Sequence, residues 1–309
     1  MAKLQVLVLG CNGQLGHELV RQLGDDCIPK PRDVLDVTDF KATRELITSI
    51  RPTALINCAA ETSVAACEKN RLASWRLNAD AADNIVKSCA LAGVPYMHIS
   101  CDQVYGLDNW HRKPYTETDI PGPCNYYGMS KLAAEHAVLR LGQCMCPEYW
   151  KAGFQYWIIR TSMLYERPWR LSNNWLYQTL KFGENRRSEE LALPTDVFRS
   201  PTYAPHLAQA LVWMLKHHKE VVSGIYHIAS TGGPSVYEIG SILSMSSKGG
   251  IKLKMTDRVT YAKTHGRDPA TMPEYTVLDS SKFNEISPNQ IRIPDWQQGV
   301  EEFALAAEE

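Results

Sequence analysis

The N-terminal stretch of this chain constrains its fold more than any other feature. The mostly apolar residues Leu4–Leu9 are followed at once by a turn with glycine at positions 10, 13 and 16. Such an apolar run predicts a strand buried on both faces, and the glycine spacing predicts a turn that opens a helix. We expect Gly10 to allow a sharp exit, Gly13 to let the backbone approach a pyrophosphate, and Gly16 to bring the helix close to the sheet.

The residues after this unit predict a repeating alternation of strand and helix. Buried strands are expected at residues 54–60 and 96–100, with a helix between them over residues 73–92. Thr38 or Asp39 is placed to cap a helix that begins near Phe40. The alternation is typical of a doubly wound, Rossmann-type parallel α/β sheet.

Composition excludes several other classes of protein. The chain has 309 residues, and its net charge of −1 creates no field that would attract nucleic acid or an anionic membrane. No apolar run approaches the ~20 residues of a membrane span, and Met1–Lys3 lead directly into the first strand without a signal peptide. We therefore expect a cytoplasmic protein without nucleic acid or membrane partners.

The nine cysteines are odd in number and scattered through apolar contexts, which favours reduced thiols that act as small buried hydrophobes. Cys144 and Cys146 lie one residue apart, but no second pair or histidine cluster accompanies them. We expect no metal site.

The end of the second strand bears on which dinucleotide would bind. A chain that binds NAD usually places an acidic residue there for the ribose hydroxyls. This sequence has Lys30 and Arg32 instead, which suit a 2′-phosphate and favour NADP(H). Two surface cations beside a proline turn would explain the same residues, so NAD(H) stays open.

Polar residues follow the expected strand 96–100 and begin at its last position: Ser100, Cys101, Asp102 and Gln103. Ligands of open α/β sheets bind at such carboxyl ends. His98 lies inside the strand, where we expect a buried structural histidine.

Tyr127 and Lys131 are four residues apart at the start of a predicted helix, so both side chains lie on one helical face. We expect the ammonium to favour the phenolate and lower the pKa of Tyr127. A tyrosine tuned in this way exchanges a proton with a carbonyl or alcohol.

With these features in this order, the sequence resembles the extended short-chain dehydrogenase/reductase superfamily and, within it, the dTDP-4-dehydrorhamnose reductase family. The similarity runs along essentially the whole chain. It is carried by residues 10–16, 35–39, 57–64, 77–78, 127–132, 159–162 and 200–202.

The resemblance implies an NADP(H)-dependent reductase of a 4-keto-6-deoxy nucleotide sugar. Tyr127 would protonate the keto oxygen, and Lys131 would hold the nicotinamide ribose. Asp36 and Val37 would contact adenine, and Arg199 would bind the diphosphate of the substrate. Cys101 and Asp102 would complete the catalytic residues. The substrate would be bound by Cys101, Asp102, Gln103 and Arg199. The remaining cofactor contacts would be Gly10, Asn12, Gly13, Gln14, Leu15, Gly16, Lys30, Arg32, Cys58, Ala59, Ala60, Thr62, Asn78 and Ser100.

The sequence departs from the family pattern at two places. Cys101 stands where the family has a catalytic Ser or Thr, and a thiol donates a weaker hydrogen bond. Ser100, Asp102 or a water is a candidate to supply that bond instead. Met272 stands where the family has an arginine before proline, and Arg267 is a candidate to replace the lost cation.

By the same resemblance, residues 1–168 would form the NAD(P)-binding Rossmann domain, and residues 169–309 a smaller α/β substrate lobe, with the chain crossing between them. We expect helices at 173–182, 205–218 and 236–243, and a strand at 225–229. Trp169, Trp175 and Tyr177 would belong to the core or stack on a ligand. A homodimer is an open expectation.

Two other functions stay open. The cysteine at position 101 also fits a nucleotide-binding regulatory subunit, as in the similar β subunit of methionine adenosyltransferase. The superfamily also includes sugar-nucleotide epimerases and dehydratases.

Overall fold

The computed structural model describes residues 4–108, 111–143, 154–166, 175–186, 188–246 and 250–307. Its centre is a six-stranded sheet in the order β2-β1-β3-β4-β5-β9, in which every neighbouring pair is parallel. The strands are β1 (Val6–Leu9), β2 (Cys27–Lys30), β3 (Ala54–Asn57), β4 (Tyr96–Cys101), β5 (Tyr156–Thr161) and β9 (Gly224–His227). The order reverses between β1 and β3, where doubly wound sheets bind their ligands.

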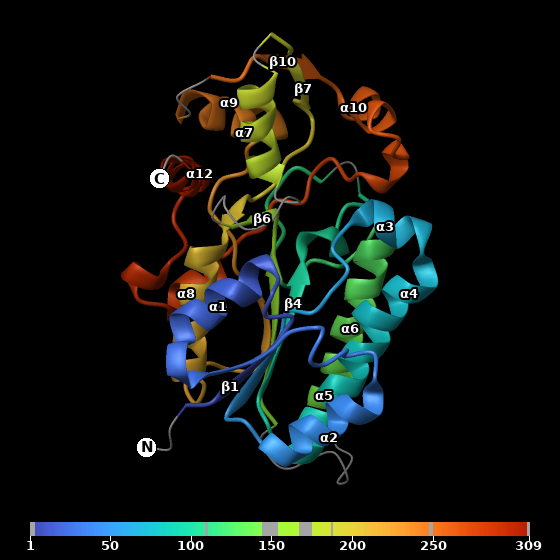
Figure 1. Cartoon of the computed structure of the whole chain (residues 1–309), viewed down its shortest axis with the longest axis vertical. Coiled ribbons are helices and arrows are strands. Elements are labelled where there is room, and N and C mark those ends of the chain that lie inside the picture. Colours follow the sequence, from blue (N-terminus) through green and yellow to red (C-terminus); the bar gives the residue numbers. More distant parts are fainter. Residues whose placement is uncertain are drawn as a thin grey trace.

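Helices cover both faces of the sheet. The helices α1 (Gln14–Leu23) and α8 (Ala204–Lys216) lie on one face, and α2 (Phe40–Ile50), α5 (Ala81–Ala92) and α6 (Tyr126–Gln143) lie on the other (Figure 1). Both faces of strand β1 are buried, which explains why its sequence is apolar at every position. Val6 and Val8 pack into one hydrophobic cluster with Leu19, whereas Leu7 and Leu9 pack into the opposite cluster. The predicted doubly wound parallel sheet is confirmed.

The expected helix over residues 73–92 is present but interrupted. It consists of α4 (Arg71–Trp75), a π-helical segment η2 (Arg76–Asp80) and α5, and a further short helix, α3 (Val64–Lys69), precedes it. Of the two expected caps before Phe40, Asp39 is the one used, because its side chain accepts a hydrogen bond from the backbone N–H of Ala42 at 3.0 Å. The predicted strand 54–60 ends at Asn57.

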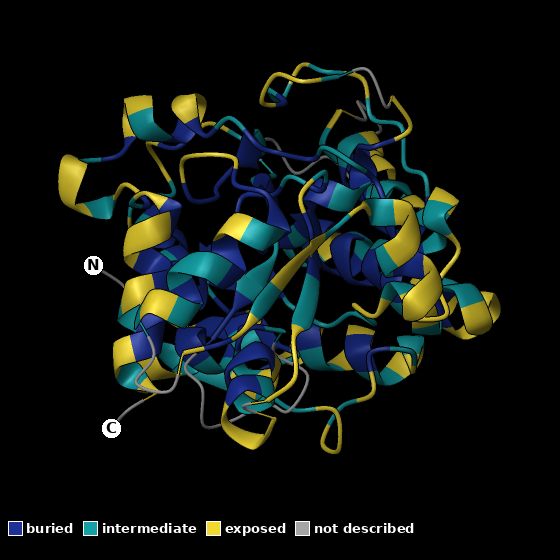
Figure 2. Cartoon of the chain, turned by 90° about the horizontal axis from the view of Figure 1, so that it is seen from above, coloured by how far each residue is buried: buried dark blue, intermediate teal, exposed yellow. Residues whose placement is uncertain are grey.

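A smaller lobe stands above the carboxyl ends of the sheet (Figure 1). Its elements are α7 (Trp175–Asn185), β7 (Leu191–Pro194), α9 (Val236–Ser246), β10 (Leu253–Thr256), α10 (Arg258–Thr264) and α12 (Trp296–Ala306). Two short parallel strands, β6 (Leu164–Tyr165) and β8 (Thr202–Tyr203), lie near its base, and α11 (Ser281–Ile286) packs on β9. Leu176, Leu243 and Phe303 belong to the core of this lobe. Exposed residues gather on the outer faces of the helices (Figure 2).

The residues expected in the smaller lobe do not form one continuous piece. Helix α8 packs on α1 and strand β9 extends the main sheet, so the chain returns to the first domain before its last helices. Four features of the sequence analysis lie outside the described residues: Cys144, Cys146, Trp169, and the first residues of the helix expected at 173–182. The boundary at residue 168 also falls there.

Candidate functional site

A cavity of about 590 Å³ opens at the carboxyl ends of the central strands, next to the point where the strand order reverses. Its wall contains many of the residues expected to bind cofactor or substrate. These are Gly13, Gln14, Leu15, Gly16, Cys58, Ala60, Thr62, Ser100, Cys101, Asp102, Gln103, Tyr127, Lys131 and Arg199.

The glycine turn forms one end of this cavity. Gly10 has φ +70°, and a Cβ there would lie 2.7 Å from the backbone N of Ala59. A Cβ on Gly16 would lie 2.3 Å from the carbonyl oxygen of Gly10, so this glycine packs against the turn itself rather than against the sheet. Gly13 is the N-cap of α1 and supplies no side-chain cap. The first N–H groups of α1 can therefore receive an anion.

Two buried polar atoms in the cavity wall have no hydrogen-bond partner among the described residues. The side-chain oxygen Oε1 of Gln14 and the hydroxyl of Thr161 are buried without a hydrogen bond within the described part of the chain. Because an unpaired buried polar atom costs free energy, both atoms favour a bound ligand with complementary groups. Gln14 lies at the glycine turn and Thr161 at the end of β5, so the two atoms lie in different parts of the cavity wall.

Strand β4 and helix α6 meet at the other end of the cavity. Lys131 donates from Nζ to the carbonyl oxygen of Ile99 at 2.6 Å. Tyr127, one turn earlier on α6, packs against the side chain of Cys101. Helix α6 begins here because Asn125 accepts the backbone N–H of Gly128 at 2.8 Å. The fold thus joins the Tyr127/Lys131 pair to the polar end of β4.

The expected effect of Lys131 on Tyr127 is wrong. Burial raises the pKa of Tyr127 well above its ordinary value, and the neighbouring Cys101 and Asp102 raise it further. The Lys131 ammonium is directed to the Ile99 carbonyl instead. Tyr127 is consequently a neutral phenol at physiological pH, which is a proton donor.

Cys101 is also uncharged, because burial raises the pKa of its thiol to about 12. A thiol in this state is a poor nucleophile. Its side chain packs against Tyr127, so it is a neighbour of the phenol in the cavity wall.

Arg199 is less available to a ligand than its residue type suggests. It is 7% exposed, and its guanidinium donates to the carbonyl oxygens of Phe198 and Pro273, each at 2.7 Å. Its Nε lies 3.9 Å from Asp102, whose carboxylate also accepts from the hydroxyl of Thr276. Arg199 lines the cavity, and its role as a diphosphate ligand stays a prediction; in this structure its guanidinium also ties the chain at Phe198 to the segment around Pro273.

Arg267 is the more accessible cation of this wall. Its side chain is exposed near Tyr261, in the wall that Trp175 also lines, and makes no hydrogen bond or ion pair with the described residues. By contrast, Arg258 donates to the carbonyl oxygens of Pro269 and Met272. Met272 itself lines the cavity, as does Trp175, which also packs in the lobe's core.

Several expected cofactor residues lie outside the cavity wall: Gly10, Asn12, Lys30, Arg32, Asp36, Val37, Ala59 and Asn78. Lys30 is the last residue of β2 and Arg32 is exposed just beyond it. Asp36 accepts hydrogen bonds from the N–H and hydroxyl of Thr38, which lower the pKa of its carboxyl. Val37 packs in the core.

Asn78 is buried and its amide is engaged within the protein. It accepts from the backbone N–H of Glu61 at 2.8 Å and donates to the Glu61 carbonyl and to Ser130, both at 3.0 Å. These bonds hold the segment after β3 against α6, so Asn78 supports the cavity wall from behind.

His98 is the buried structural histidine that we expected. It is 1% exposed, contacts the Tyr96 hydroxyl at 3.0 Å, and stays neutral because burial lowers its pKa well below the ordinary value.

Sequence reasoning missed part of the wall, chiefly Thr161, Met163, Val197, Val236 and Tyr261. Thr161 and Met163 could have been found, because they lie at the carboxyl end of β5 just as Ser100 and Cys101 do at β4. Met163 has φ +39°, an uncommon conformation for a non-glycine residue. The others come from the smaller lobe, where no strand-end rule applies.

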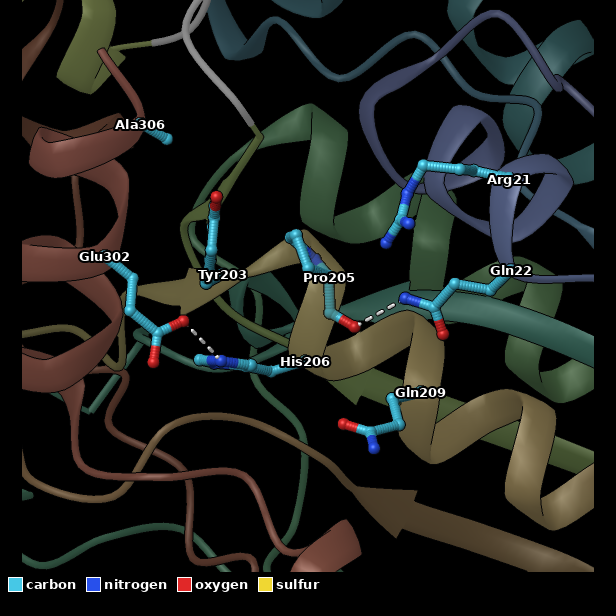
Figure 3. A pocket seen from close by; sticks show the side chains of 8 residues that line it. All are labelled: Arg21, Gln22, Tyr203, Pro205, His206, Gln209, Glu302 and Ala306. Carbon is cyan, nitrogen blue, oxygen red and sulfur yellow. Dashed lines mark hydrogen bonds and ion pairs between the residues drawn. The ribbon is translucent and has the colours of Figure 1, made fainter. Parts of the chain in front are cut away.

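A second, more open hollow of about 460 Å³ lies between α1, α8 and α12 (Figure 3). Its wall carries an ion pair between His206 and Glu302 at 2.9 Å, and Gln22 donates to the carbonyl of Pro205. None of the expected site residues lines it. The described residues contain no group of His, Cys, Asp and Glu that could hold a metal ion. Within the same ranges no helix has the length and apolar character to cross a membrane.

Comparison with known proteins matches residues 4–308 to the family model described as RmlD substrate binding domain. The dTDP-4-dehydrorhamnose reductase of Escherichia coli (strain K12) is 30% identical over 306 residues, which cover 96% of each chain. The spore coat polysaccharide biosynthesis protein SpsK of Bacillus subtilis is 30% identical and covers 97% of this chain and 96% of its own.

Solved structures agree with these relatives. A dTDP-4-dehydrorhamnose reductase from Bacillus anthracis in complex with NADP superposes with a TM-score of 0.82 at 28% identity, covering 98% of this chain and 99% of its own. A Thermus thermophilus UDP-glucose 4-epimerase in complex with NAD has a TM-score of 0.75 at 18% identity, covering 99% of each chain, and shares the fold.

Proposed function

Because this chain belongs to the RmlD substrate binding domain family, we propose that it is an NADPH-dependent reductase of a 4-keto-6-deoxy nucleotide sugar. One observation carries the proposal. The neutral phenol of Tyr127 and the ammonium of Lys131 share a cavity with a glycine turn whose helix N-terminus lacks a side-chain cap.

The residues present fit a dinucleotide. Gly13 and the N–H groups at the start of α1 would hold the pyrophosphate. Lys30 and Arg32 would receive the 2′-phosphate, with Asp36 and Val37 at the adenine. Lys131 would hold the nicotinamide ribose. When bound, reduced nicotinamide supplies the hydride that the reaction requires.

Tyr127 would supply the proton. The keto carbon of the substrate gains the hydride, its oxygen gains the phenolic proton, and the C=O double bond becomes an alcohol. The phenol is suited to this direction because burial keeps it protonated. Cys101 and Asp102 would lie beside the developing hydroxyl. Solvent later returns a proton to the phenolate.

The nucleotide part of the substrate would occupy the side of the cavity formed by the smaller lobe. There we assign the diphosphate to Arg267, because Arg199 is largely engaged by backbone carbonyls and Met272 is uncharged. Trp175 and Tyr261 provide aromatic surface nearby.

The test is to incubate the purified protein with NADPH and a panel of 4-keto-6-deoxy nucleotide sugars that vary in base and sugar. We expect the absorbance of NADPH to fall with at least one member and the product to carry a new hydroxyl at C4. Tight nucleotide binding without turnover of any member would instead support the regulatory-subunit function. Protein purified with bound oxidised nicotinamide that interconverts two sugars would support an epimerase.

A further inference from the structure

Three consecutive residues at the end of β4 contact three residues on successive turns of α6. The carbonyl oxygen of Ile99 accepts a hydrogen bond from Lys131, and the hydroxyl of Ser100 donates one to Glu135. The side chain of Cys101 packs against Tyr127. These contacts fix both the rotation of α6 and its height on the strand. The position of Tyr127 therefore depends on contacts up to two turns further along the helix.

Glu135 is the least exposed member of this set. It is fully buried, and Arg160 on β5, itself 2% exposed, donates to both of its oxygens. Arg160 Nη2 lies 2.6 Å from Oε2, and Nε lies 3.0 Å from Oε1. Since both ions are desolvated, this pair is retained only where its geometry is well satisfied.

We propose that Glu135 is a positioning residue of the catalytic face, which holds the Ser100 hydroxyl in place and supplies a negative charge one helical turn from Lys131 on the same face of α6. The proposal rests on the proposed function only in treating Lys131 as catalytic.

The charges around Lys131 support this role. Burial lowers the pKa of Lys131, and Cys101, Glu135 and Cys58 oppose that effect. The thiols of Cys101 and Cys58 have pKa values raised to about 12, so they are neutral at physiological pH. His98 on β4 is neutral as well. Of the groups that raise the pKa of Lys131, Glu135 is the one that forms an ion pair, with Arg160.

The same contact limits what Ser100 can do. Its single hydroxyl proton is donated to Glu135, so the lone pairs of its oxygen are what it can offer the cavity. Ser100 then accepts hydrogen bonds from a ligand and does not replace the missing Ser/Thr donor at position 101.

Two kinds of variant separate the charge of Glu135 from its hydrogen bond. The double variant E135Q/R160M removes both charges but keeps an acceptor for Ser100, and removing a buried pair together is commonly tolerated. The variant S100A removes the hydrogen bond and keeps the charge. E135D keeps a carboxylate for Arg160 but shortens the side chain by one methylene, which moves the charge away from Lys131. It replaces the double variant in the experiment if the double variant does not fold.

The readout is competitive acetylation of Lys131 with acetic anhydride over the alkaline range, followed by mass spectrometry, with near-UV circular dichroism to verify folding. It requires neither substrate nor turnover. We expect E135Q/R160M to label about ten-fold faster than the wild type at a fixed pH, because less of the amine is protonated. E135D should show a smaller increase, and S100A should label as the wild type does.

Wild-type labelling of the folded double variant and of E135D would overturn the proposal. So would an equal increase in S100A, because it would indicate a general loosening of α6. If the substrate panel shows turnover, S100A should lower kcat by about ten-fold with little change in KM. A failure of the panel with the expected labelling pattern would count against the proposed function alone.

Discussion

Tyr127 packs against Cys101 in the wall of the cavity, and the neighbouring thiol helps to raise the pKa of the phenol. The phenol therefore lies at the end of β4, where a substrate ketone would have to accept its proton. A thiol competes weakly for that proton, because hydrogen bonds to sulfur are weak. Cys101 thus leaves the phenolic proton available to the substrate.

Tyr127→Phe should abolish the proton donor without changing the cavity. We expect kcat to fall by about 10²–10⁴-fold on the scale of general-acid effects, with NADPH affinity retained. Steady-state NADPH oxidation and the fluorescence of bound NADPH measure the two quantities. An unchanged kcat would show that another group provides the proton.

Cys101→Thr should hold or raise kcat, because a hydroxyl donates a stronger hydrogen bond than a thiol from the same position. Cys101→Ala is the matched control and should lower kcat by removing the neighbour of Tyr127. Complete loss of activity in C101T with a native circular dichroism spectrum would indicate thiol chemistry instead.

Arg267→Ala should raise KM for the nucleotide sugar by about ten-fold or more and leave kcat almost unchanged, because the cation contacts a part of the substrate that does not react. Arg292→Ala removes another exposed arginine, one that does not line the cavity, and should change neither constant. An equal effect of both variants would refute a specific phosphate contact.

Gly16→Ala should destabilise the protein by about 1–3 kcal/mol, because its Cβ would lie 2.3 Å from the Gly10 carbonyl oxygen. Gly13→Ala is the informative comparison, since its nearest neighbour would lie at 3.3 Å and its φ of −76° is ordinary. We expect G13A to fold normally and to lose NADPH affinity. Urea unfolding measures the stability of each variant, and NADPH titration measures its cofactor affinity. Normal NADPH affinity in G13A would show that the glycine turn does not bind the phosphates.

His227 should make the protein sensitive to acid. Burial lowers the pKa of this histidine from 6.5 to about 3, with a smaller contribution from Arg160. Its Nδ1 donates to the Tyr115 carbonyl at 2.9 Å, so the neutral form is the one that the fold accepts. Between these two pKa values the unfolded chain binds more protons than the folded one.

The free energy of unfolding should therefore fall as the pH drops from 6.5 to about 3, by up to roughly 5 kcal/mol from this group. His227→Gln removes the titration and should flatten this part of the pH dependence, as measured by urea midpoints at a series of pH values. Parallel curves for the wild type and H227Q would contradict the assignment.

Much of the site could be predicted because it follows local rules. The glycines of the turn, the polar residues after β4 and the Tyr127/Lys131 spacing are short-range patterns, and the fold brings all three to one cavity. The tuning of Tyr127 could not be predicted. Helical spacing indicates a neighbouring cation, whereas the pKa depends on burial and on where the Lys131 ammonium points.

Arg199 illustrates the same limit. Its residue type and position predict a ligand for phosphate, but they do not predict that its guanidinium also donates to the carbonyls of Phe198 and Pro273, the second of which lies far along the sequence. The lobe boundary was equally hard to place, because α8 and β9 return to the first domain after an excursion into the second.

The amino-acid sequence alone determined the alternation of buried strands and amphipathic helices, and with it the edge of the sheet at which a ligand binds, because periodicity and turn chemistry act over a few residues. The tertiary structure decided which charges face one another. Glu135 is paired with Arg160 and directed at Ser100 and Lys131 by the packing of α6 on β4 and β5. Such long-range pairing in a desolvated interior sets protonation states, and no local pattern encodes it.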